Sequence, residues 1–386
     1  MDPIQRRAIR NGVVAAAITA VTLFAFEAVR PEASPPQATP SVTASPSPTC
    51  EASWDVLPSI DPDQEGNQLL AVAAAPDGQM WAVGGFGPPE TPTSTLVERW
   101  DGQLWVVTAT PNPDSVNVLN AVTVAGPEDV WAVGRSSNGV EDLPLIERWD
   151  GIGWTLSPVP AIDGGAALYG VAAAGRTVWA VGASRSGDLG TEQALILRWD
   201  GSEWGAETLP AVPGPSVLRA VTAVSRDDAW AIGAQGDRPL ALRFTGKRWR
   251  RIPVPGRGQL VAVAPGLGDG AWAVGSSLLR WDGTAWTNAG AARRQGTLQG
   301  IAAVSADEAW AVGFGPGARN GVNRALVQRY DGTGTGWSIV DGPGVPGSDV
   351  LTAAAAAPDG SVWMVGYRDT ANRRATFIGR GSVTCA

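Results

Sequence analysis

ERWDGQLW, residues 98–105, returns in modified form five times along the chain. The copies are ERWDGIGW (147–154), LRWDGSEW (197–204), LRFTGKRW (242–249), LRWDGTAW (279–286) and QRYDGTGTGW (328–337). A carboxylate, a glycine and two aromatic rings at nearly constant spacing are compatible with a binding or catalytic motif. They are equally compatible with a structural repeat, and periodicity over tens of residues indicates a repeat architecture.

A second motif shows how the repeat is built. A strand of the type WAVG recurs seven times at intervals of 38 to 53 residues, at 81–84, 131–134, 179–182, 230–233, 272–275, 310–313 and 363–366. A stretch rich in Ala, Val and Gly precedes each copy, and the RWDG segment and a later Trp follow most of them. Seven units of four short strands predict an all-β fold, a seven-bladed β-propeller over residues 50–386. A solenoid of the same units is the alternative.

The residue types fit an inner-to-outer order of strands within each blade. Small side chains suit a strand that lines a crowded axis, whereas large rings fill the space where neighbouring blades diverge. All 18 tryptophans fall on the second strand, at the end of the third or at the start of the fourth. A carboxylate copied in five units, as Asp101 is, indicates a turn residue before glycine and not a catalytic group.

The ends of the repeat region predict how the ring closes. The seventh unit lacks a fourth strand, and SWDVLP (53–58) precedes the first unit as a fourth strand without a blade. We expect this N-terminal strand to complete blade seven, which removes exposed sheet edges. Cys50 and Cys385 then meet at one corner of that blade, and we predict a disulfide between them, given an oxidising compartment.

At this point the units resemble known propeller repeats. A second strand ending in glycine, a variable loop and a third strand ending in Tyr-Asp or Trp-Asp, with a later Trp, is similar to the Kelch repeat and to the central domain of galactose oxidase. Unit one carries the double glycine Gly84-Gly85, and unit six keeps the Kelch-like spacing in YDGTGTGW (330–337). The Trp-Asp pair also resembles the WD repeat, without its Gly-His partner. The resemblance extends to exported bacterial propellers with WAVG and RWDGxxW units; it implies the fold and says little about function.

Composition excludes several kinds of chemistry. The 386 residues include no histidine, which removes Ser-His-Asp catalysis and His-ligated zinc or copper, including that of a Kelch-like copper oxidase. Two cysteines cannot form a structural zinc site. The net charge of −8 argues against nucleic acid as a partner.

The first 49 residues predict the cellular location of the protein. Arg6, Arg7 and Arg10 precede an uncharged stretch from 11 to 26, the pattern of an export signal or anchor helix over residues 1–29. Residues 30–49 are rich in Pro, Ser and Thr and predict a disordered linker. We expect a single-pass anchor in a bacterial cytoplasmic membrane with the propeller outside the cell membrane; secretion after signal cleavage is the alternative.

Candidate binding residues lie where the units differ, because loops on a rigid scaffold commonly carry function. The variable connections between the second and third strands and between units should emerge on one face. Aromatic and basic side chains gather there: Phe86, Arg135, Phe314, Tyr367 and Arg368. Such side chains suit an envelope protein or a glycan, and padding of the blade tops is the alternative.

Two further segments are candidates for ion or polymer binding. Asp61, Asp63 and Glu65 match the first positions of a calcium loop, but Val72 stands where that loop needs Glu, so a solvated turn is favoured and no cofactor is expected unless calcium binds there. The basic run KRWRR (247–251) suits acidic polymers or lipid headgroups, although a charged edge strand is the simpler interpretation.

Together these features favour a non-catalytic, monomeric binding or scaffold protein outside the cell membrane. The alternative is a carbohydrate-active enzyme of the glycosidase type that uses carboxylates in the central funnel. A pair of unpaired carboxylates facing each other across the funnel would distinguish that enzyme from a binding protein.

Overall fold

The computed structural model describes residues 50–186, 191–266, 269–290, 295–305, 307–317, 322–332, 336–343 and 348–385. In these ranges every regular element is a β-strand, and the strands form seven four-stranded antiparallel sheets. The seven-bladed propeller predicted from the repeats is therefore confirmed. The predicted N-terminal helix and linker lie outside the described residues, and no helix that could cross a membrane occurs within them.

Each blade takes its strands in sequence order from the inside outward. Blade one contains β2 (Asn67–Ala74), β3 (Met80–Phe86), β4 (Ser94–Trp100) and β5 (Trp105–Val107), and blade two β6 (Val116–Gly126), β7 (Asp129–Ser137), β8 (Asp142–Trp149) and β9 (Trp154–Leu156). Blade three contains β10 (Ala166–Ala174), β11 (Thr177–Ser186), β12 (Thr191–Trp199) and β13 (Trp204–Ala206). Blade four contains β14 (Ser216–Ser225), β15 (Asp228–Gln235), β16 (Arg238–Thr245) and β17 (Trp249–Ile252). Blade five contains β18 (Leu260–Pro265), β19 (Ala271–Gly275), β20 (Leu279–Trp281) and β21 (Trp286–Asn288), and blade six β22 (Thr297–Ala303), β23 (Ala309–Pro316), β24 (Asn323–Tyr330) and β25 (Trp337–Val340).

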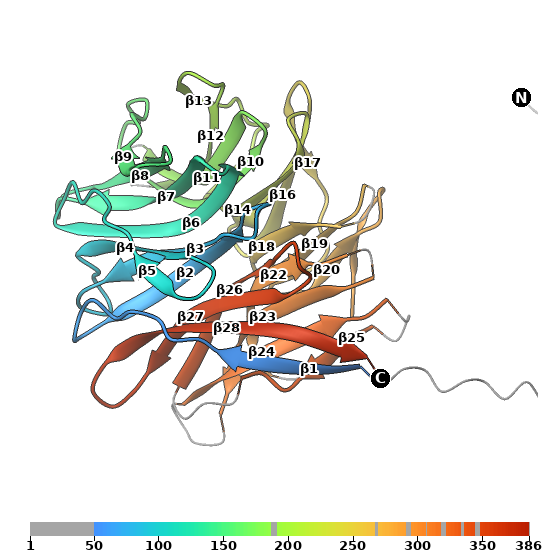
Figure 1. Ribbon diagram of the computed structural model, residues 1–386. Helices are drawn as coiled ribbons and strands as arrows, with labels where there is room; N and C mark the ends of the chain where they lie inside the picture. Colours follow the sequence, from blue (N-terminus) through green and yellow to red (C-terminus); the bar gives the residue numbers. More distant parts are fainter. Residues whose placement is uncertain are drawn as a thin grey trace, which may run out of the picture. The chain divides into compact units, whose positions relative to one another are not determined.

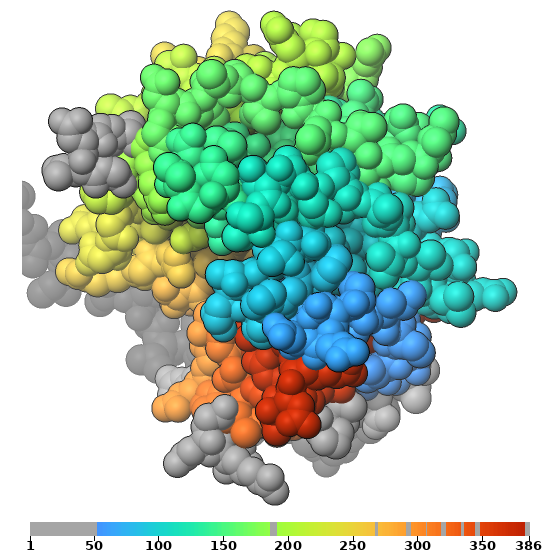
Figure 2. All heavy atoms as spheres, turned by 90° about the vertical axis from the view of Figure 1, so that its left-hand side faces the viewer, coloured from blue at the N-terminus to red at the C-terminus, as the bar shows by residue number. Residues whose placement is uncertain are grey.

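Blade seven closes the ring with strands from both ends of the described chain. It contains β26 (Ser348–Ala356), β27 (Val362–Asp369), β28 (Arg374–Cys385) and, outermost, β1 (Cys50–Val56). The ladder runs from Cys50 opposite Cys385 to Val56 opposite Gly379, and Figure 1 shows the blue β1 beside the red β28. In Figure 2 the colours pass around the molecule in sequence order until blue meets red. The predicted closure by the N-terminal strand is confirmed.

Aromatic clusters join each blade to the next. The Trp of the second strand contacts the aromatic residue that ends the third strand of the following blade and the Trp that begins its fourth strand; Trp81, for example, packs on Trp149 and Trp154 at ring-centroid distances of 5.2 and 5.4 Å. All 18 tryptophans belong to one of these seven clusters. The arginine of the repeat adds a cation–π contact, as Arg148 does over Trp131 at 4.9 Å. The rings therefore hold the blades together, as their positions in the repeat predicted.

Blade seven departs from this pattern in a way that follows from its closure. Gly381 stands where the other blades carry an aromatic residue at the end of the third strand. A Cβ atom at this glycine would overlap the ring of Trp54, which comes from β1. Trp54 lies over the glycine and reaches Trp310 of blade six at 5.4 Å. Trp54 holds the fourth-strand position that Trp105 holds in blade one, so this cluster lacks only the third-strand ring, and the glycine leaves room for Trp54.

The Asp-Gly pair of the repeat forms the turn between the third and fourth strands. The Oδ1 atom of Asp101 accepts hydrogen bonds from the backbone N–H groups of Gln103 and Leu104, both at 2.8 Å, and Gly102 has a φ of 105°. Asp150, Asp200 and Asp282 make the equivalent pair of bonds. These bonds stabilise the ionised carboxylate and lower the pKa of Asp101. The side chain acts as a turn residue, as the repeat indicated.

Candidate functional site

A bulge in every inner strand creates a ring of seven variable residues. The ladder between the first and second strands of each blade skips one residue, which follows a leucine and precedes Ala or Gly in all seven blades. The skipped residues, which we call the bulge ring, are Leu70, Asn120, Tyr169, Arg219, Val261, Gln299 and Thr352. All seven side chains are partly exposed.

The same bulge explains the glycine of the WAVG motif. The residue before the leucine that precedes the bulge turns its carbonyl oxygen over the second strand. At Gly84 and Gly134 an added Cβ would overlap the carbonyl oxygens of Gln68 and Val118. Glycine is required there for close backbone approach. The skeleton of the blade is therefore constant on both sides of the bulge, and the chemistry of the ring is free to vary from blade to blade.

Adjacent inner strands bring the bulge ring together. They contact one another in the order β2, β6, β10, β14, β18, β22 and β26, and β26 contacts β2. Asn120 donates a hydrogen bond across to the Leu168 carbonyl at 2.8 Å, and Thr352 donates one to the Leu69 carbonyl at 2.8 Å. These two polar members therefore tie neighbouring blades together.

Tyr169 and Arg219 form the chemically richest part of the ring. The Arg219 guanidinium lies over the Tyr169 ring, with its Cζ 4.4 Å from the ring centroid. Among the described residues no carboxylate pairs with Arg219. A partly exposed aromatic ring next to such a cation can bind an anionic or amide group of a partner.

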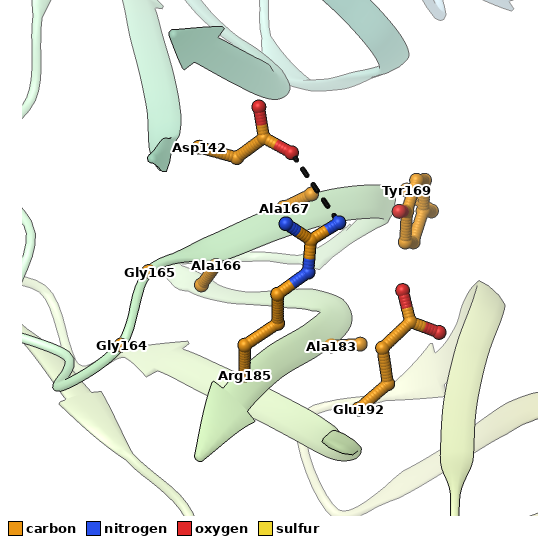
Figure 3. A pocket seen from close by; sticks show the side chains of 9 residues that line it. All are labelled: Asp142, Gly164, Gly165, Ala166, Ala167, Tyr169, Ala183, Arg185 and Glu192. Carbon is orange, nitrogen blue, oxygen red and sulfur yellow. Dashed lines mark ion pairs between the residues drawn. The ribbon is translucent and has the colours of Figure 1, made fainter. Parts of the chain in front are cut away.

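A small polar recess adjoins Tyr169 on the face that carries the connections between blades. Figure 3 shows Arg185 between Asp142 and Glu192, with Tyr169 beside Glu192. Asp142 pairs with Arg135 at 2.9 Å and with Arg185 at 3.9 Å. The recess measures about 20 Å³, which is room for roughly one water molecule. It extends the polar surface around Tyr169 and does not enclose a substrate.

The sequence-predicted binding residues make contacts within the chain. Arg368 bonds to Asp349 at 2.6 Å, and its side chain is 19% exposed. Tyr367 lies beneath the Arg374 guanidinium at 4.1 Å, and burial raises the pKa of its hydroxyl.

The remaining predicted residues differ in position along their strands. Arg135, Phe314 and Tyr367 each lie opposite the residue just before the leucine that precedes the bulge. Phe86 is one residue further along β3, so its side chain faces the other side of its sheet. Both phenylalanines are partly exposed. Blades six, seven and one adjoin one another through their inner strands, so the aromatic residues share a sector of the ring without forming one common surface.

The acidic loop before blade one, residues 61–66, forms hydrogen bonds within the chain. Asp61 accepts hydrogen bonds from the backbone N–H and the hydroxyl of Thr376, both at 2.8 Å, and Asp63 accepts the N–H groups of Glu65 and Gly66 at 2.7 and 3.2 Å. Within the residues that the structure describes, no group of three or more acidic or cysteine side chains could hold a metal ion. The carboxylates of Asp61 and Asp63 thus accept hydrogen bonds from the chain itself.

Two buried glutamates were not predicted. Glu98 and Glu147, the first residues of two repeat copies, are fully buried between blades, where blades three, four and five carry leucine. Ser59 donates a hydrogen bond to the Glu98 carboxyl group, with oxygen distances of 2.9 and 3.1 Å. Among the residues that the structure describes, neither oxygen of Glu147 has a hydrogen-bond partner. Burial raises the pKa of Glu98 to about 7 and that of Glu147 to about 8.

The sequence contained a signal for both features that were missed. The bulge ring corresponds to the one changing letter between Leu and Ala or Gly, and the buried acids stand on the leucine side of an alternating strand. Periodicity alone did not reveal that the residue after the leucine is a bulge, because a skipped residue is defined by how its strand pairs with another strand.

Comparison with known proteins supports the propeller fold and does not identify a function. No family model and no curated protein matches this chain. A structure of YCF48 bound to D1 peptide is similar at 16% identity and a TM-score of 0.56, covering 85% of this chain and 94% of that chain. The RRP9 WD40 repeats are similar at 11% identity and a TM-score of 0.60, covering 88% and 100%, and YCF48 from Cyanidioschyzon merolae at 16% and 0.55, covering 85% and 98%.

Proposed function

We propose that this propeller is a non-catalytic binding or scaffold protein that holds a partner on the face carrying the bulge ring. The observation that carries the proposal is the ring itself: seven partly exposed side chains of different chemistry stand on an otherwise repeated skeleton. Tyr169 and Arg219 form the recognition centre of the bulge ring, because the tyrosine side chain offers contact area and the guanidinium group, 4.4 Å from it, offers charge.

The location and the partner belong to the same proposal. The basic residues and apolar stretch of residues 1–29, with the linker that follows, support a membrane-anchored protein whose propeller lies outside the cell membrane. The partner is then an envelope protein or a glycan. Similarity to WD40 propellers supports a scaffold role, and the YCF48 structure with a bound peptide offers a precedent for the architecture.

The described site offers little to glycoside hydrolysis. That reaction needs two carboxyl groups on either side of a sugar bond, one as acid and one as base or nucleophile. The bulge ring contains no carboxylate, and of the two at the adjoining recess, Asp142 is paired with two arginines. We therefore do not extend the proposal to that chemistry.

Crosslinking from the native envelope tests the proposed binding role. A photoreactive amino acid at position 169 should capture one partner, and a Tyr169→Ala/Arg219→Ala variant, crosslinked with a lysine-independent reagent, should lose it. The matched control is Val261→Ala/Gln299→Ala, in the next two blades along the ring, which should retain the partner. Equal recovery with both double variants would overturn the assignment of the site.

A further inference from the structure

Blade four carries an open groove of strongly basic character at its outer edge. Its walls are two stretches of five residues: Ala206–Pro210, which leaves blade three, and Lys247–Arg251, which includes part of the edge strand β17. We call this feature the basic groove. Its volume, open to solvent, is about 670 Å³, and the Lys247–Arg251 wall is about 16 Å long if extended at ~3.3 Å per residue.

The charge of the groove contrasts with that of the chain. Four exposed cations, Lys247, Arg248, Arg250 and Arg251, lie along one wall of a protein whose net charge is −8. None of the four pairs with a carboxylate among the described residues. The one carboxylate of the groove, Glu207, already lies 3.8 Å from Arg198. Arg251 donates a hydrogen bond to Gln235 Oε1, so Lys247, Arg248 and Arg250 are the cations most available for an outside partner.

This basic character is a departure of one blade from the repeat. The corresponding turn and fourth strand of blades one, two, three, five and six contain one or two carboxylates and no cation. Blade four replaces the turn aspartate by Thr245 and places four cations around Trp249, which keeps its buried position against Phe244. The structural role of the segment is thus retained while its surface charge is reversed.

The groove also has the features that an extended peptide needs. β17 is the last strand of its sheet, so one side of its backbone is unpaired by any described strand. Leu209 is partly buried against the same core cluster as Trp249, which supplies an apolar floor. An unpaired strand edge binds an extended segment through main-chain hydrogen bonds, and side-chain pockets and charges select its sequence.

We propose that the basic groove of blade four binds an extended acidic segment of a partner protein, which adds as a strand beside β17. Charge complementarity selects the acidic residues, and the unpaired edge of β17 favours an extended chain over a flat membrane surface. This site is separate from the bulge ring, so the two can be occupied or lost independently.

Binding of a defined peptide to the full-length chain tests the proposal. The probe is a fluorescein-labelled peptide of eight residues that alternates Glu and Val, followed by fluorescence anisotropy. The Arg248→Ser/Arg250→Ser variant should weaken binding by about tenfold at low salt, since exposed charges contribute additively and are screened by salt. Methylating alternate backbone amides of the peptide should weaken binding to the unaltered chain by a similar factor, because strand pairing needs those groups.

A control with the same change of charge isolates the groove. Arg176 and Arg238 are exposed and unpaired among the described residues, so Arg176→Ser/Arg238→Ser should change the Kd by less than about twofold. Equal loss in both double variants, or full binding of the methylated peptide, would overturn strand addition. Binding of phosphatidylserine vesicles that depends on Arg248 and Arg250, with no binding of the peptide, would overturn the peptide in favour of a lipid surface. Tyr169→Ala/Arg219→Ala should leave peptide binding unchanged, which separates this test from that of the proposed function.

Discussion

Replacing Glu147 by glutamine should remove a pH dependence from the stability of the propeller. The carboxyl group is fully buried between blades one and two, and no described residue donates a hydrogen bond to either oxygen. Burial raises its pKa from the ordinary value of 4.5 to about 8. The folded protein therefore keeps the proton over a pH range in which the unfolded chain has lost it.

The sign and size of the effect follow from linkage. An acid whose pKa is higher in the folded state contributes its full stability below pH 4.5, and this stability falls as the pH rises toward 8. Between pH 5 and pH 9 the free energy of unfolding should fall by about 4 kcal/mol through this group, at ~1.36 kcal/mol per pKa unit. Glutamine resembles the protonated acid in shape and hydrogen bonding, so the variant should match the unaltered protein at pH 5 and exceed it by about 4 kcal/mol at pH 9.

Urea unfolding followed by tryptophan fluorescence at pH 5, 7 and 9 measures this difference, and a thermal midpoint shift of roughly 5 °C at pH 9 should accompany it. The chain suits the experiment because it has no histidine, so few other side chains titrate in this range. Glu98→Gln should show a smaller gain, about 3 kcal/mol, since its pKa is raised only to about 7. Exposed Glu203 is the control, and Glu203→Gln should leave the pH profile unchanged. Parallel profiles for the unaltered protein and Glu147→Gln would refute the assignment of a buried, raised-pKa carboxyl group.

Three further predictions concern the frame of the propeller. Trp363→Ala should destabilise the fold by about 3–5 kcal/mol, because its ring packs on two tryptophans of blade one at the closure; a loss below about 1 kcal/mol in urea would contradict this role. Asp101→Asn should lower the thermal midpoint slightly and leave partner binding intact, and loss of binding without unfolding would show that the aspartate has a functional role. Cys50 and Cys385 are direct partners in the β1–β28 ladder, a spacing that suits a disulfide, so non-reducing mass spectrometry of exported protein should find them linked; the crosslink would add up to about 5–6 kcal/mol on the loop-entropy model, and two free thiols would exclude it.

The frame of the fold was legible in the sequence because each repeated residue has a local reason for its place. The Asp-Gly pair at 101–102 makes its turn from hydrogen bonds within four residues, and Trp81 and Trp105 mark strands that each need a large ring. Closure followed from counting strands, since a fourth strand before unit one had to complete unit seven.

The candidate site was only partly legible for the opposite reason. Phe86, Tyr367 and Arg368 stand at the ends of strands where ligand contacts are plausible, but Arg374 covers Tyr367 and Asp349 bonds to Arg368. Those partners are set by the pairing of hairpins and blades. No pattern within one repeat shows whether a polar side chain makes its hydrogen bonds and ion pairs inside the molecule or is free to contact a partner.

The sequence by itself determined the seven blades and the order of the four strands in each. It also determined the aromatic residues that pack between neighbouring blades and the strand that closes the ring. These depend on turn chemistry and ring size, which act locally and repeat. Only the tertiary structure decided that the variable residue after the leucine of each inner strand is a bulge, that Glu98 and Glu147 are buried between blades, and that the KRWRR segment (247–251) lines a groove. Each of these is a relation between strands or blades, and burial, pairing and open edges exist only once the ring has closed.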